Sequence, residues 1–142
     1  SWFTGAAVML GALPHPLILV LALLYSIGAH GIMTLNDFKS IDGDTRMGVR
    51  SLPVQLGPDR AARLACVVMT VPQMAVILML ISIGRPVHAG IVLILLGAQV
   101  WLMRPLLADP RGKAIWYSAF GVLLYVLGML ASAFAVAPWS AG

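Results

Sequence analysis

Charged side chains are scarce in this sequence. Asp, Glu, Lys and Arg make up 10% of its 142 residues, while hydrophobic residues make up 61%. A soluble domain carries roughly 25% charged residues, so this composition excludes an ordinary soluble enzyme or binding domain. Mean hydropathy is +0.97, which predicts an all-α integral membrane protein. The single cysteine, Cys66, excludes an intramolecular disulfide.

Several common catalytic patterns are also missing. The sequence has no Cys/His spacing of a metal site, no nucleophile elbow and no Walker-type phosphate loop. It also lacks the basic start of a signal peptide. The chain opens in an apolar stretch without an initiator methionine, so we expect an N-terminal part of a longer protein to precede it.

Long apolar runs dominate what is present. A membrane-spanning helix needs about 20 apolar residues. We expect full spans at 17–35, 61–83, 87–103 and 114–137, the end of another span at 1–13, and a polar loop at 36–60. The predicted fold is therefore a helical bundle in a lipid bilayer, with about four full transmembrane helices and a partial one.

Small and aromatic residues predict how these spans pack. Glycines within spans indicate close helix contacts, and aromatic residues at span ends indicate an interfacial belt. The glycines are Gly28, Gly31, Gly90, Gly97, Gly121 and Gly128, and the aromatic residues are Trp101, Trp116, Tyr117 and Trp139.

The basic residues are distributed unevenly along the chain. Of the nine Lys and Arg residues, eight fall in 36–63 and 104–113, and Arg85 alone lies in another connection. The two basic segments are separated by two spans, so they fall on the same side of the membrane. The positive-inside tendency places that side in the cytoplasm. Topology accounts for the bases, so we expect no nucleic-acid partner.

One short stretch, residues 36–50, concentrates the charged side chains. It holds three of the five acidic residues of the chain and three interleaved bases: Asp37, Asp42 and Asp44, with Lys39, Arg46 and Arg50. Carboxylates are ligands that Mg²⁺ prefers, and Arg and Lys bind phosphate oxygens. The stretch therefore predicts a site for a Mg²⁺–diphosphate at the membrane surface.

Helical spacing arranges these carboxylates unequally. If the first span continues past the membrane as a helix, Asp37, Ser40 and Asp44 share one stripe and can share a Mg²⁺. Asp42 would lie about 140° away from Asp37 unless Gly43 bends the chain. The alternative interpretation is a solvated loop whose aspartates cap helices.

Two polar residues lie within the first span itself. Tyr25 and His30 are candidates for a substrate pocket, because polar groups at membrane depth commonly mark functional sites. Asn36 and Ser40 at the end of the span complete this candidate set. The alternative is that Tyr25 and His30 are core residues bonded to neighbouring helices.

Four sequence segments of the chain resemble those of a known family. The segments are Leu35–Asp44, Met47–Val54, Ser51–Gly57 and Leu124–Phe134. They resemble the UbiA superfamily of intramembrane prenyltransferases, and within it the chlorophyll synthase branch, above all its bacteriochlorophyll synthases. The resemblance covers essentially the whole chain.

The resemblance implies a fold and an activity. The family fold has nine transmembrane helices, and residues 1–142 would be its C-terminal half, with residues 36–50 as the second of two cytoplasmic aspartate-rich motifs. Members of this branch esterify chlorophyllide or bacteriochlorophyllide with a geranylgeranyl or phytyl group from its diphosphate. Asp37, Asp42 and Asp44 would bind Mg²⁺, and Lys39, Arg46 and Arg50 the diphosphate. The implied location is a bacterial inner, photosynthetic membrane.

Two departures from the family pattern leave alternatives open. Ser40 stands where other members often carry an aspartate, and no first motif occurs in the 142 residues. Alone, the chain would hold half a metal site and be incomplete for catalysis. It would need the N-terminal half of the same enzyme. Alternatively it is a pigment-binding or assembly subunit of a photosynthetic complex, with His30 on a pigment Mg. A third alternative is an enzyme whose acceptor is a quinone or haem precursor. The sequence of the Asn36–Ser40 segment disfavours it.

Overall fold

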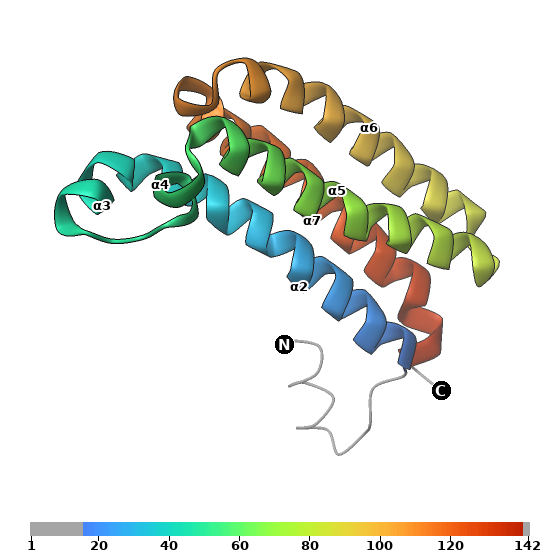
Figure 1. The fold of residues 1–142 in the computed structure, drawn as a ribbon. Coiled ribbons are helices and arrows are strands. Elements are labelled where there is room, and N and C mark those ends of the chain that lie inside the picture. Colours follow the sequence, from blue (N-terminus) through green and yellow to red (C-terminus); the bar gives the residue numbers. More distant parts are fainter. Residues whose placement is uncertain (1–15, 141–142) are drawn as a thin grey trace.

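The computed structural model describes residues 16–140, and the side chains of residues 16–136. Its elements in chain order are α2 (Pro16–Asp37), η1 (Phe38–Ser40), α3 (Ile41–Met47), α4 (Leu52–Leu56), α5 (Pro58–Ser82), α6 (Pro86–Ala108) and α7 (Pro110–Ser140). The described residues contain helices and no strand (Figure 1), which confirms the predicted all-α class.

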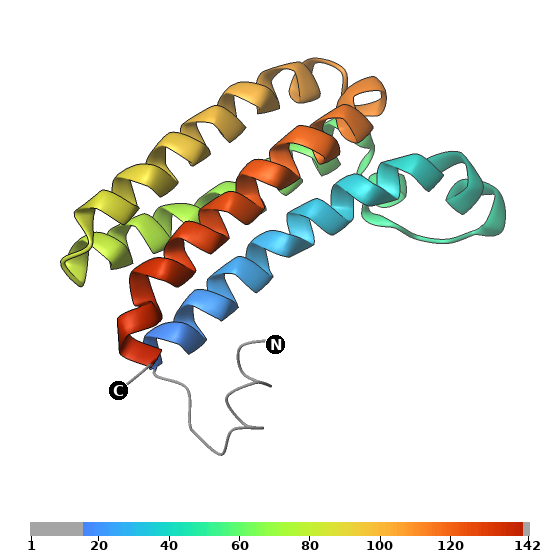
Figure 2. The same cartoon turned by 180° about the vertical axis from the view of Figure 1, so that it is seen from behind.

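Four long helices form one bundle. α2 packs against α5 and α7, and α6 lies against α5 and α7 on the other side (Figures 1 and 2). All four are long and apolar enough to cross a membrane, and the chain is therefore an integral membrane protein. The predicted partial span at 1–13 lies outside the described residues.

The helices begin and end where the sequence supplies special backbone residues. Pro58, Pro86 and Pro110 open α5, α6 and α7, where a missing N–H costs nothing. Gly84 has a φ of 76° in the turn between α5 and α6, a conformation that glycine adopts readily. Gly84 thus closes the short connection between α5 and α6.

Two helices extend beyond the predicted spans. α6 continues to Ala108 instead of ending near residue 103, and α7 begins at Pro110 instead of residue 114. The Asp109 carboxylate accepts a hydrogen bond from the Gly112 N–H at 3.1 Å, which caps the start of α7. The charged residues Arg104, Arg111 and Lys113, expected between the spans, thus lie within α6 and α7.

The predicted polar loop at 36–60 is largely helical. After α2 the chain makes one 3₁₀ turn, η1, and continues as α3 until Gly48, whose φ is 71°. The short helix α4 then leads to α5. Gly43 lies inside α3 and Pro53 near the start of α4, both positions that a helix tolerates. The segment predicted as a loop therefore consists mostly of short helices.

Polar side chains join the helices inside the bundle. Gln73 of α5 and Gln99 of α6 form a reciprocal amide pair at 3.1 and 3.0 Å. Such buried hydrogen bonds fix the register of helices that an apolar surface alone would leave unspecified.

Tyr117, predicted as an interfacial aromatic, is fully buried, so that prediction was wrong for this residue.

Candidate functional site

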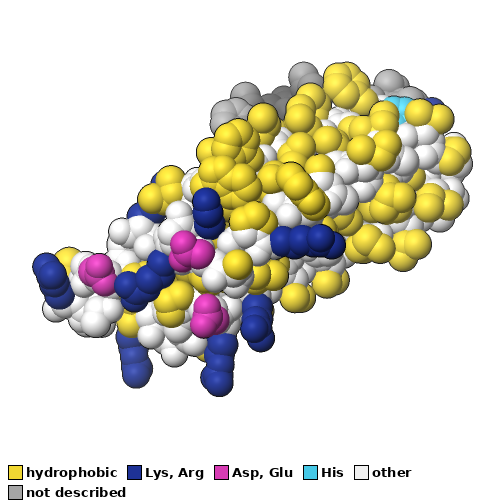
Figure 3. Space-filling model, turned by 90° about the horizontal axis from the view of Figure 1, so that it is seen from above, with side chains coloured by type: hydrophobic (Ala, Val, Ile, Leu, Met, Phe, Trp, Pro, Cys, Tyr) yellow, Lys and Arg dark blue, Asp and Glu magenta, His cyan; other side chains and the backbone are white. Residues whose placement is uncertain are grey.

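The charged residues meet at one end of the bundle. The C-terminal ends of α2 and α6 and the N-terminal ends of α5 and α7 lie there, beside α3 and α4 (Figure 1). Figure 3 shows most Lys, Arg, Asp and Glu side chains of the visible face gathered at this end, with apolar side chains over the rest. We call this the motif end, defined by residues 36–63 and 104–113. The common placement of the two basic segments is as the topology predicted.

Three polar side chains continue the line of α2 past the apolar span. Asp37 is the last residue of α2, and Ser40 ends the 3₁₀ turn. The Ser40 hydroxyl lies 3.3 Å from the Asp37 carbonyl oxygen and 3.4 Å from Oδ2 of Asp44, one turn further on. These are long hydrogen bonds, but they place Ser40 and Asp44 on one face, as the spacing predicts. We call Asp37, Ser40 and Asp44 the acidic face.

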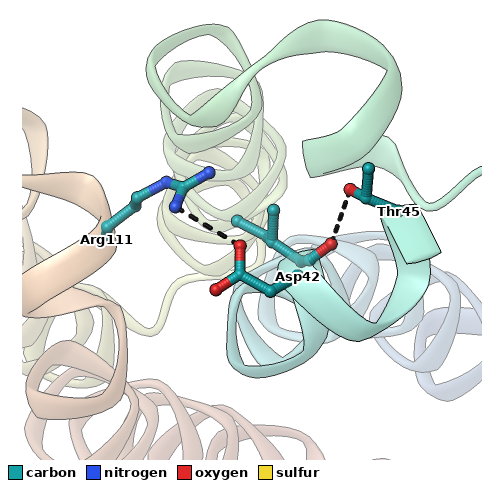
Figure 4. A network of polar contacts seen from close by, with 4 residues as sticks. Asp42, Thr45 and Arg111 are labelled. Carbon is teal, nitrogen blue, oxygen red and sulfur yellow. Dashed lines mark hydrogen bonds and ion pairs between the residues drawn. The ribbon is translucent and has the colours of Figure 1, made fainter.

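Asp42 points elsewhere, toward the start of α7. Its Oδ1 lies 3.7 Å from Nη1 of Arg111 (Figure 4). The side chains are 84% and 59% exposed, respectively, and such exposed pairs contribute little to stability. Beside it, the Thr45 hydroxyl donates to the Ile41 carbonyl at 2.7 Å, and Ile41 is buried in the core. Gly43 does not bend the chain, so the predicted divergence of Asp42 holds.

The ion pair adds a residue that sequence reasoning missed. Arg111 counted only as a topology-determining base, because it lies 69 positions after Asp42 and no local pattern links them. Only the position of α7 relative to α3 in the folded structure shows this contact. Arg111 is the one base that pairs with an acid among residues 16–136.

The fit of a metal ion to these residues is partial. No group of three His, Cys, Asp or Glu side chains close enough to bind one ion exists in the described part of the chain. Asp37 and Asp44 are seven residues apart, about 10 Å along a helix, while Mg²⁺ needs its ligands at about 2.1 Å. The two carboxylates therefore provide oxygen donors on one face but do not enclose a single ion.

The three predicted phosphate-binding bases are exposed. Lys39, Arg46 and Arg50 have side chains open to solvent, and none forms an ion pair with an acid of the described residues. The Arg50 carbonyl accepts a hydrogen bond from the Gln55 side chain, which ties the chain between α3 and α4 to α4. Their guanidinium and ammonium groups are thus available to an anion.

The candidate pocket residues of the first span separate into two groups. Tyr25 is buried, and its hydroxyl bonds the Ser132 hydroxyl of α7 at 2.9 Å. This matches the alternative of a core residue bonded to a neighbouring helix. His30 is exposed on the outer surface of the four-helix unit, and Asn36 is exposed at the motif end. The predicted pocket residues are therefore not brought together within the described chain.

Fold and site together define an α-helical membrane protein with an acidic face at the end of a spanning helix. The model of the UbiA prenyltransferase family matches residues 2–124. The chain belongs to this family, as the sequence motifs at residues 35–57 indicated.

Named relatives come from the same branch. The chain is 58% identical over 135 residues to the bacteriochlorophyll synthase 33 kDa chain of Cereibacter sphaeroides, covering 95% of this chain and 45% of the relative. It is 52% identical over 117 residues to the 34 kDa chain of Chloroflexus aurantiacus, covering 82% and 38%. Identity to the chloroplastic chlorophyll synthase of Arabidopsis thaliana is 35% over 135 residues, covering 94% and 34%.

The chain spans less than half the length of these curated relatives. No solved structure shows a significant match to it. The family is thereby established, and the activity of a whole protein containing this chain is a matter for proposal.

Proposed function

We propose that this chain is the C-terminal half of a prenyltransferase that esterifies (bacterio)chlorophyllide a with a geranylgeranyl or phytyl group from its diphosphate. The observation that carries the proposal is the acidic face at the end of an apolar span, Asp37, Ser40 and Asp44, in a family of prenyltransferases. The pigment acceptor is inferred from the names of the relatives, at 58% and 52% identity.

The chemistry requires strong charge compensation. An oxygen of the acceptor carboxylate forms a bond to the allylic carbon, the bond from that carbon to the diphosphate breaks, and the diphosphate keeps the electron pair. Lys39, Arg46 and Arg50 are exposed and unpaired with acids of the described residues, so their donors can bind the leaving group. The apolar helices keep water away from the reacting carbon.

The carboxylates contribute to charge compensation by binding a metal ion. Members of the family generally use a divalent metal. In our proposal Asp37 and Asp44 would each give carboxylate oxygens to bound Mg²⁺ without enclosing one ion by themselves, and the metal would offset negative charge on the diphosphate. Asp42, expected as a further ligand, faces Arg111 through Oδ1, so it points away from the acidic face and only its Oδ2 is free of that pair. The remaining ligands come, in this proposal, from the other half of the enzyme.

We place the motif end on the cytoplasmic side of a bacterial inner, photosynthetic membrane. Support comes from the eight bases at that end against Arg85 at the other, and from the photosynthetic names of the relatives. A membrane-impermeant maleimide should label Lys113→Cys from the cytoplasmic side and Arg85→Cys from the opposite side. The reverse pattern would reject this orientation.

The proposal is tested with the full-length protein in membranes, supplied with bacteriochlorophyllide a, geranylgeranyl diphosphate and Mg²⁺. We expect an esterified pigment, identified by chromatography and mass spectrometry, that disappears with EDTA and returns with excess Mg²⁺. Parallel assays with phytyl diphosphate and chlorophyllide a define donor and acceptor.

Absence of ester from a correctly inserted full-length protein would contradict the proposal. Recovery of the protein at fixed stoichiometry with light-harvesting subunits would then favour the alternative, a pigment-binding or assembly subunit.

A further inference from the structure

The outer face of α2 carries two exposed polar side chains within an otherwise apolar surface that includes Leu23, Ile27 and Met33. Ser26 and His30 are both exposed, and Asp37 at the end of the helix is half-buried. The spacing of four and then seven residues puts all three on one side of the helix. The acidic face thus continues down the membrane-spanning part of α2 through His30.

The opposite side of α2 accounts for the helix contacts of the bundle. That side holds Leu21, Tyr25, Gly28 and Leu35, all buried, and α2 packs there against α5 and α7. His30 takes no part in this packing. Its backbone carbonyl accepts a bond from Thr34 at 2.9 Å, while its imidazole has no hydrogen bond to any described side chain or backbone group.

An imidazole facing outward at this depth requires a polar partner. His30 lies two turns below Asp37, about 10 Å along the helix axis, and polar side chains in hydrocarbon are costly unless they bind something polar. Tyr25, five residues earlier, satisfies the same requirement within the bundle through Ser132. The partner of His30 is therefore outside the described chain.

We propose that His30 binds the carboxylate of the prenyl acceptor, donating a hydrogen bond from its imidazole. This inference rests on the proposed function, and it assigns the acceptor subsite to the face of α2 directly below the acidic face. His30 is thus an acceptor-binding residue, and the wall that α2 contributes to the reaction cavity is its outer face.

The distances along α2 agree with this assignment. A hydrogen bond from imidazole to carboxylate spans about 3 Å, and a carboxylate oxygen poised for attack lies about 3 Å from the carbon. Together with the separation of the two carboxylate oxygens, these spans take up most of the roughly 10 Å between the His30 and Asp37 positions along the helix axis. The carbon–oxygen–phosphorus link and the diphosphate then lie level with Asp37 and beyond it, beside Ser40 and Asp44.

The role of His30 in the reaction is orientation. The acceptor reacts as its carboxylate, so one oxygen bonds the allylic carbon while the diphosphate leaves with the electron pair, and no proton has to move. A hydrogen bond to the other oxygen fixes the carboxylate in line with the bond that breaks. Loss of that bond should weaken acceptor binding and leave diphosphate binding unchanged.

The test compares two forms of the acceptor on the full-length protein. Binding of bacteriochlorophyllide a and of its methyl ester is titrated by pigment absorbance in detergent, for wild type, His30→Leu and His30→Gln. His88→Leu is the matched control, because His88 lies near the start of α6 at the opposite end of the bundle. We expect wild type to bind the acid about tenfold or more tightly than the ester.

In His30→Leu the acid-to-ester preference should fall to within about twofold of unity, while His30→Gln, which keeps a donor, and His88→Leu should retain most of it. KM for the prenyl diphosphate should stay within about twofold of wild type. An unchanged preference in His30→Leu, equal loss of acid and ester binding, or no preference in wild type would each overturn the assignment. Equal loss would indicate contact with the macrocycle or its metal instead.

This outcome is separable from the proposed function. The binding titration needs no turnover, so it can reject the role of His30 in a protein that makes ester. Conversely, absence of ester in the assay above rejects the function whatever the titration shows.

Discussion

Single side chains on α2 divide into those that hold the bundle and those that face away from it. Tyr25 is 4% exposed, and its ring meets Tyr125 edge-on at 5.3 Å. The Tyr125 hydroxyl donates to the Tyr25 carbonyl at 2.5 Å. The Ser132 hydroxyl donates to the Gly128 carbonyl at 2.8 Å, so its oxygen is left to accept from Tyr25. Tyr25 is therefore a connection between α2 and α7.

Replacement of Tyr25 tests this structural role. Tyr25→Phe removes the bond to Ser132 and keeps the ring packing, so unfolding in detergent should be easier by about 1 kcal/mol. The double variant Tyr25→Phe/Ser132→Ala should lose less than the sum of the two single variants, because both remove one shared bond.

Ester formation by folded Tyr25→Phe should stay within about twofold of wild type, since no substrate contact is lost. A large loss of activity at unchanged stability would instead return Tyr25 to the substrate pocket.

At the scale of the helices, close approach depends on particular glycines. A Cβ at Gly31 would lie 2.6 Å from the Ala65 carbonyl oxygen of α5, and one at Gly28 would collide with the Tyr125 hydroxyl of α7. Gly90 and Gly97 of α6 have open space at the Cβ position. The prediction of close contacts is confirmed for the α2 glycines and wrong for those of α6, because composition does not tell which face of an apolar helix is inside.

The difference gives a matched pair of substitutions. Gly31→Ala must push α2 from the backbone of α5, so it should lower stability by about 1 to 3 kcal/mol. Gly90→Ala introduces the same methyl group into open space and removes a flexible residue, so it should be neutral or stabilising by a few tenths of a kcal/mol.

Thermal or denaturant unfolding of the two variants in the same detergent measures both effects. Equal stability of Gly31→Ala and Gly90→Ala would show that α2 and α5 are not in the close contact described.

For the molecule as a whole, the sequence allowed the class and the four spans to be predicted, because runs of apolar residues and the placement of Lys and Arg depend only on the bilayer. It did not allow the side that Tyr25 and His30 face to be predicted. The span from 17 to 35 carries only a few polar side chains, on more than one side of the helix. Their spacing shows which of them share a side, but not which side is buried against α5 and α7. The Asp42–Arg111 contact was equally hidden, since it depends on how α7 docks beside α3.

The central claim is that the acidic face holds the Mg²⁺ that binds the diphosphate, and one comparison tests it most directly. Ester formation by the full-length protein is measured for Asp37→Asn and Asp44→Asn beside Asp59→Asn, an exposed aspartate at the start of α5. Each substitution removes one charge at the same end of the bundle. The account predicts losses of about a hundredfold or more for the first two and activity within about twofold of wild type for the third. Equal activities of all three variants would contradict it.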